Sequence, residues 1–210
     1  MGTPDGKRGY AATAVLALAG AVVLGKTVTR PSNPEPNYAG PAEIRHIPDG
    51  DALPPATPVR VDIDDAGVHA PLMALGTNPD GTVQVPPFSK ARYAGWYRPG
   101  PAPGVRGNAV ILGHLDDEHT AAAFYRLKTV RRYEEIEVTR ADGTVAVFMV
   151  DAVQKVRKTS FPASLVYGPV RYAGLRLVTC GGPFDYRRHS YRDNLIVYAH
   201  LTEGRGVRAR

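Results

Sequence analysis

Short runs of strand-forming residues, separated by turn signals, limit what this chain can fold into more than any other feature. They begin near residue 57 of the 210-residue chain. Residues 78–81 (Asn-Pro-Asp-Gly) and 141–143 (Ala-Asp-Gly) are typical of tight turns. Many short strands in about 145 residues predict an all-β protein, either a closed barrel or a sandwich. The expected strands are residues 59–63, 69–72, 83–85, 109–113, 136–139, 145–150, 153–158, 175–179 and 195–201.

The composition is that of a globular protein. Apolar residues make up 43% of the chain and charged residues 22%, which argues against disorder of the whole chain. A body of about 150 residues can bury an adequate core without disulfides. One short helix is expected at residues 120–127, where alanines and Phe124 lie on one side.

A run of 17 uncharged residues, 9–25, lies between Lys7-Arg8 and Lys26. This is the short end of the roughly 17–25 residues that span a bilayer. We favour an uncleaved signal anchor, which forms a hydrophobic helix before the folded body. A cleaved signal peptide is the second interpretation, because residues 17–21 offer small-x-small cleavage sites. A helix buried in the body is the third, and the Pro-rich stretch that follows disfavours it.

The chain divides into four parts. Residues 1–26 form the expected membrane anchor or signal segment. Residues 31–58 contain eight prolines and few core-forming residues, so we interpret residues 27–56 as a semi-extended linker. Residues 57–202 form the expected folded domain, and residues 203–210 a basic tail.

The distribution of charge excludes nucleic-acid binding as the main function. The net charge of +6 is concentrated at the two ends of the chain. Residues 1–30 carry +3 and residues 201–210 carry +2, which leaves +1 for residues 31–200. A nucleic-acid reader concentrates basic charge on its folded domain.

Cys180 is the only cysteine, so the chain has neither an internal disulfide nor a cysteine-based zinc cluster. It ends an expected strand and precedes Gly181-Gly182-Pro183, a position where a substrate can reach the side chain. A buried small hydrophobic residue is the alternative interpretation. An exported free thiol needs a reason, and nucleophilic catalysis supplies one.

Two further side chains lie where expected strands begin or end. His114 follows residues 109–113, and Arg192 precedes residues 195–201. Histidine is the usual base for a thiol, and an arginine can donate to an oxyanion. The alternatives are a histidine bonded to a loop carbonyl or Asp116, and an arginine in a surface ion pair with Asp193 or Asp185.

The order and context of these residues resemble a sortase, the surface transpeptidase of Gram-positive bacteria. The distances along the chain, 66 residues from His114 to Cys180 and 12 from Cys180 to Arg192, are similar to those of the family. Arg176 departs from the first Thr of the T-L-x-T-C motif, and His119 is a rival base. The flanking segments look like class F sortases of actinobacteria. The matching segments are 108–114, 177–180 and 192–199, with flanks at 95–100, 113–116 and 180–185.

The resemblance implies a closed eight-stranded β-barrel with short helices. It also implies a cysteine transpeptidase and endopeptidase of the hydrolase type, which cuts an LPXTG-like sorting signal between Thr and Gly. Cys180 would form a thioester, His114 would act as general acid, and Arg192 would stabilise the oxyanion. Thr179 and Leu112 are expected to bind substrate. The chemistry requires no metal and no organic cofactor.

The same resemblance implies the partners and the location. The substrates would be sorting signals of secreted surface proteins, and the acyl acceptor an amine of a cell-wall precursor. The enzyme would be a single-pass protein of the cell membrane, with its catalytic domain outside the cell.

Two other functions compete with this interpretation. Another exported cysteine transpeptidase or peptidase is disfavoured, because His114 precedes Cys180 and an S-H-G-x-x-x-x-C arrangement is absent. The other is a membrane-tethered β-barrel binding module without catalysis. Its groove could be lined by aromatic residues, namely Trp96, Tyr97, Tyr93 and Tyr125.

Overall fold

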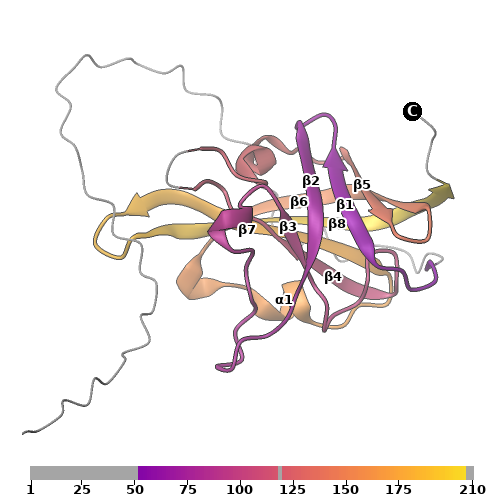
Figure 1. Ribbon diagram of the computed structural model, residues 1–210, viewed down its shortest axis with the longest axis horizontal. Coiled ribbons are helices and arrows are strands. Elements are labelled where there is room, and N and C mark those ends of the chain that lie inside the picture. Colours follow the sequence, from indigo (N-terminus) through magenta and orange to yellow (C-terminus); the bar gives the residue numbers. More distant parts are fainter. Residues whose placement is uncertain (1–51, 118–119, 207–210) are drawn as a thin grey trace, which may run out of the picture.

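The computed structural model describes residues 52–117 and 120–206, and these form a closed β-barrel (Figure 1). The strand order around the barrel is β1-β2-β3-β4-β7-β8-β6-β5, and β5 pairs with β1 to close it. The predicted all-β barrel of eight strands with few short helices is therefore confirmed. The strands are β1 (Pro58–Ile63), β2 (Val68–Leu75), β3 (Ala94–Tyr97), β4 (Gly107–Leu112), β5 (Glu135–Arg140), β6 (Thr144–Arg157), β7 (Ala173–Asp185) and β8 (Ser190–Gly206).

The helices are short and lie between strands. One α-helix, α1, spans Ala163–Tyr167. Single 3₁₀ turns span Phe88–Lys90, Tyr125–Thr129 and Lys158–Ser160. Within the described ranges, no helix has both the length and the apolar character needed to cross a membrane. The expected hydrophobic helix at residues 1–26, and the linker up to residue 51, lie outside the described residues.

Two parallel pairs, β2 with β3 and β4 with β7, interrupt an otherwise antiparallel barrel. The parallel pair of β4 and β7 sets the position of the site, because their carboxyl ends emerge at the same edge. Strands β7 and β8 then run antiparallel and extend together into a hairpin that projects from the barrel (Figure 1).

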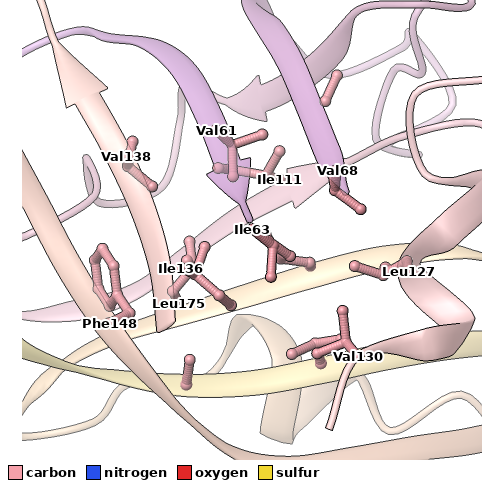
Figure 2. Packing of buried hydrophobic residues seen from close by; sticks show 14 of the residues in the cluster. Val61, Ile63, Val68, Ile111, Leu127, Val130, Ile136, Val138, Phe148 and Leu175 are labelled. Carbon is pink, nitrogen blue, oxygen red and sulfur yellow. The ribbon is translucent and has the colours of Figure 1, made fainter. Parts of the chain in front are cut away.

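Side chains alternate between the barrel interior and its outer surface. Around β4 and β7 the side chains on both of these faces are buried. Ile111 and Leu177 point into the main core, which Figure 2 shows from close by. Their neighbours Val110 and Val178 belong to a second cluster, which Val166 of α1 joins. Burial on both faces explains why residues 109–112 read as one continuous apolar run.

Several expected elements differ from the observed ones. Residues 145–150 and 153–157 are parts of one strand, β6, whose register shifts between Val150 and Ala152, and Lys158 begins a 3₁₀ turn. Strand β8 continues to Gly206 and thus includes the first residues of the expected tail. Leu53, within the expected linker, packs against the barrel core.

The helix expected at residues 120–127 was wrong, and only a 3₁₀ turn at Tyr125–Thr129 overlaps with it. Backbone N–H groups in the middle of this segment donate to distant carbonyls instead of to the preceding turn. Ala123 donates to Ala91 (2.9 Å) and Phe124 donates to His114 (2.9 Å). These contacts tie the segment to the loop that follows β4 and to the residue that follows the 3₁₀ turn at Phe88–Lys90.

The strand expected at residues 83–85 was also wrong. Val83 forms an isolated bridge with Thr77, and Val85 is 56% exposed. The segment is one arm of a loop between β2 and β3, so its apolar side chains face a groove instead of the core.

Arg176, the departure from the family motif, is fully buried beneath α1. Its guanidinium donates to the carbonyls of Leu165 (3.2 Å) and Ala199 (3.3 Å) and to the hydroxyl of Tyr172 (2.9 Å). It also lies 5.1 Å from the ring centre of Tyr198. Arg176 therefore joins α1 to the barrel wall, on the strand that carries Cys180 four residues later.

Candidate active site

Strand register brings Cys180 and His114 to the same end of the barrel. In the parallel pair of β4 and β7, Leu112 is the partner of Val178, and the N–H of Gly113 donates to the Val178 carbonyl (3.1 Å). His114 and Cys180 each lie two residues further along. The expectation that Cys180 ends its strand was wrong, because β7 continues to Asp185. His114 does follow the end of β4, and the register places it beside the part of β7 that carries Cys180.

Both residues line a groove of about 890 Å³ on the outer surface of the barrel. Cys180 is partly exposed there. The groove wall is mainly apolar. It is built from the β2–β3 loop, the end of β4 and the loop after it, the middle of β7, the start of β8, and the α1 region. Its apolar residues include Val83, Val85, Leu112, Phe161, Tyr167 and Val178. Such a wall suits an extended peptide with apolar side chains.

His114 is held by two contacts from the β2–β3 loop. Its Nε2 atom lies 2.6 Å from the Pro86 carbonyl oxygen. Its ring stacks on Phe88, with ring centres 4.6 Å apart and planes inclined by 19°. Because a carbonyl only accepts hydrogen bonds, Nε2 carries the proton in this contact. The alternative interpretation of a histidine bonded to a loop carbonyl therefore describes the observed contact, and it does not conflict with a role in catalysis.

Tyr191 joins the far side of the groove to the loop that carries His114. Its hydroxyl donates to the Asp116 carboxylate. Burial, then this hydrogen bond and the Asp116 charge, raise the pKa of Tyr191 well above its usual value. The hydroxyl therefore remains a donor at physiological pH, and β8 stays connected to the segment after β4.

Arg192 does not line the groove. Its side chain is 63% exposed, and its Nε lies 3.4 Å from a carboxylate oxygen of Asp185. This is the ion pair considered as its alternative role. The residue that pairs with Cys180 across β7 and β8 is Asn194, and Asn194 does line the groove.

The two expected substrate-binding residues both border the groove, but in different ways. Leu112 packs at the edge of the outer cluster, beside Val178. Thr179 is only 3% exposed, and strand alternation turns its side chain to the face opposite that of Cys180. Thr179 can therefore meet a substrate chiefly through its backbone. The rival base His119 lies outside the described residues.

Sequence reasoning missed three residues of this site, namely Asn194, Phe88 and Tyr191. The sequence did carry a signal for Asn194. In the family pattern R-x-x-V-x-A, alignment on Val197 and Ala199 puts Asn194 in the first position. The stacking of Phe88 on His114 and the bond from Tyr191 to Asp116 join residues 26 and 75 positions apart. No local sequence pattern predicts contacts between residues so far apart in the chain.

No group of three or more His, Cys, Asp or Glu side chains suited to a metal ion occurs in residues 52–117 and 120–206.

Comparisons with known proteins agree with this geometry. The family model described as Sortase domain matches residues 61–202, more than half of the chain. A search of curated proteins gives no match. Listeria monocytogenes sortase A is similar in structure, with a TM-score of 0.55, 16% identity, and 75% of this chain and 92% of that chain covered. The SrtA sortase from Actinomyces oris has a TM-score of 0.58 and 22% identity, and the match covers 76% of this chain and 93% of that chain. A sortase C2 of Group B Streptococcus Pilus Island 1 has a TM-score of 0.51 and 19% identity, and the match covers 69% of this chain and 73% of that chain. At these identities the similar structures show the fold, and the family model shows the membership: this chain belongs to the sortase family.

Proposed function

We propose that this sortase cleaves an LPXTG-like sorting signal between Thr and Gly and transfers the acyl part to an amine. The family implies a cysteine transpeptidase that acts on sorting signals and uses an amine acceptor. The observation that carries the proposal is the parallel register of β4 with β7, which brings His114, just after β4, and Cys180, within β7, onto one mainly apolar groove.

The proposed chemistry has two steps. In the first, the Cys180 thiolate attacks the Thr carbonyl, the Thr–Gly amide bond breaks, and His114 gives a proton to the departing Gly amine. The result is a thioester on Cys180. In the second, an acceptor amine attacks the thioester, loses a proton to His114, and the thiolate leaves. Attack by water instead of an amine would give hydrolysis.

The tetrahedral intermediate of each step needs a hydrogen-bond donor for its oxyanion. Arg192 is the donor proposed from the family motif, and it would have to leave Asp185 to reach the groove. The Asn194 side chain is a second donor, supported by its position opposite Cys180. An amide NH₂ group can fill this role without carrying a charge.

We further propose that the enzyme is a class F sortase held at the cell membrane by residues 1–26, with its barrel outside the cell. The flanks at 95–100, 113–116 and 180–185 support the class, and the uncharged run at 9–25 supports the anchor. The acceptor would then be an amine of a cell-wall precursor, and the donors secreted surface proteins.

The alternative of a binding module without catalysis loses part of its support. None of Trp96, Tyr97, Tyr93 and Tyr125 lines the groove. Trp96 is 8% exposed and donates to the Pro101 carbonyl (3.0 Å), so it fills the barrel wall.

The test is a mass-spectrometric trap of the acyl-enzyme. The full chain in detergent is mixed with an LPXTG peptide, and Cys180 is examined for an adduct that ends in Thr. We expect the adduct, its release by an added amine, and no turnover by a folded Cys180→Ala variant. Turnover by that variant would refute the mechanism, and an inert Cys180 would favour the binding module.

A further inference from the structure

The loop between β2 and β3 reaches the groove and holds the ring of His114. We propose that Phe88 and the Pro86 carbonyl are positioning elements that fix the ring plane of His114 and keep its Nε2 protonated. Proton exchange with the thiol and the substrate then passes through Nδ1. The part of this inference that concerns catalysis rests on the proposed role of His114.

The first support is the stacked pair of rings. Phe88 and His114 are nearly parallel at 19°, with ring centres 4.6 Å apart. Phe88 is nonetheless 50% exposed, so it contributes little to the barrel core. A large apolar ring that is left half in solvent but stacked on one imidazole face restricts rotation of that imidazole.

The second support is the bond from Nε2 to the Pro86 carbonyl. At 2.6 Å this is a short contact, and its acceptor cannot donate. The carbonyl is itself well oriented, because Pro87 follows and confines Pro86 to extended backbone. In the neutral ring, the Pro86 carbonyl therefore selects the tautomer with hydrogen on Nε2 and a lone pair on Nδ1.

The third support is the bracing of the loop that carries both contacts. Gln84 closes its base: the Gly76 N–H donates to the Gln84 side-chain oxygen (2.8 Å), and the Gln84 N–H donates to the Gly76 carbonyl (3.1 Å). Further out, the Asn78 N–H donates to the Thr82 carbonyl (2.8 Å). A loop held in this way can place Pro86 and Phe88 reproducibly against His114.

The direct test is nuclear magnetic resonance of the His114 ring in ¹⁵N-histidine-labelled full-length protein, at a pH where the ring is neutral. We expect the tautomer with hydrogen on Nε2. In Phe88→Ala the two ring nitrogens should instead approach an average of the two tautomers. The opposite tautomer in the wild type, or an unchanged ring in Phe88→Ala, would overturn the inference.

Kinetics give a second readout. Phe88→Ala should lower kcat by about tenfold or more, because small misplacements of a catalytic group are costly. Phe88→Tyr keeps the flat face and should restore kcat, whereas Phe88→Leu, which keeps apolar bulk alone, should not. Full activity of Phe88→Leu would show that only bulk matters and would overturn the stacking role.

Tyr93→Ala is the matched control. Tyr93 is an exposed aromatic residue of the same segment, and it contacts Lys90 and does not line the groove. We expect no change of the His114 ring or of kcat in this variant, and an equal loss of kcat would overturn the specific role of Phe88.

The two proposals fail separately. An Nε2-protonated ring without a Cys180 adduct refutes the proposed function alone, and an adduct with an unaffected ring in Phe88→Ala refutes the positioning role alone.

Discussion

Asn194 lies directly opposite Cys180 in the antiparallel pair of β7 and β8. Directly opposed residues point to the same face of a sheet, with Cβ atoms about 4.5–5.5 Å apart. Arg192 lies two residues earlier and is ion-paired with Asp185 outside the groove. The groove thus has a neutral amide group beside the thiol, whereas the guanidinium of Arg192 is paired outside the groove.

Replacing Asn194 should therefore damage catalysis. Loss of one oxyanion donor lowers kcat by about 10²–10³-fold in other acyl-transfer enzymes, and we expect Asn194→Ala to lower acyl-enzyme formation by at least tenfold. Because Asn194 is partly exposed, the thermal midpoint should change little. Rapid-quench measurement of the acyl-enzyme checks this, and a wild-type rate would remove Asn194 from the oxyanion role.

Arg192→Lys should be nearly as damaging as Arg192→Ala, because the planar guanidinium with its five donors is lost in both. The measurement is kcat/KM for an LPXTG peptide. Arg188→Ala is the control, since Arg188 is an exposed arginine of the same hairpin. Wild-type rates in Arg192→Lys would exclude a bidentate role for Arg192, and an equal loss in Arg188→Ala would point to general charge on the hairpin.

Much of the barrel could be predicted from the sequence because its strands bury one or both faces. The run at residues 109–112 is apolar without interruption, and β4 lies there, between the core and the outer cluster. Strand β3 was not predicted, because it has only four residues, Ala94–Tyr97, and one of them is a glycine. The expected helix at 120–127 failed because its N–H groups bond to other segments of the chain.

Cys180 and His114 were found through their local motifs, but their arrangement was not. That His114 adjoins Cys180 depends on the parallel register of β4 with β7, which no short pattern encodes. Arg192, which is exposed, lies in the irregular stretch of the hairpin between the pairs Gly181–Asp193 and Phe184–Tyr191. The first fact arises from pairing between distant segments, and the second from a local irregularity of one hairpin.

Alkaline pH should destabilise the fold partly through two tyrosines. Burial raises the pKa of Tyr198 to about 12, and the pKa of Tyr191 is raised further, by burial and Asp116. Above the ordinary tyrosine value of about 10, the unfolded chain releases these protons while the folded chain keeps them. The free energy of unfolding then falls as pH rises from about 10 towards the folded-state values.

Thermal midpoints of the wild type and Tyr191→Phe across this alkaline range check the prediction. The variant should lose less stability per pH step, because one of the raised groups is gone. Parallel curves would show that Tyr191 ionises alike in the folded and unfolded chains.

Gly113 should tolerate no side chain. A Cβ atom there would lie 2.6 Å from the ring of Phe124, which is fully buried and cannot move aside freely. The Phe124 N–H also donates to the His114 carbonyl, so a shift of Phe124 displaces the residue next to the substituted one. We expect Gly113→Ala to cost about 1–3 kcal/mol of stability, by overpacking, and to lower kcat.

Denaturant unfolding and peptide cleavage measure the two effects. Gly206→Ala is the control, because a Cβ at Gly206 meets nothing within 4 Å. Equal stability of the two variants would show that the Phe124 ring yields, and a normal kcat in Gly113→Ala would show that His114 does not depend on it.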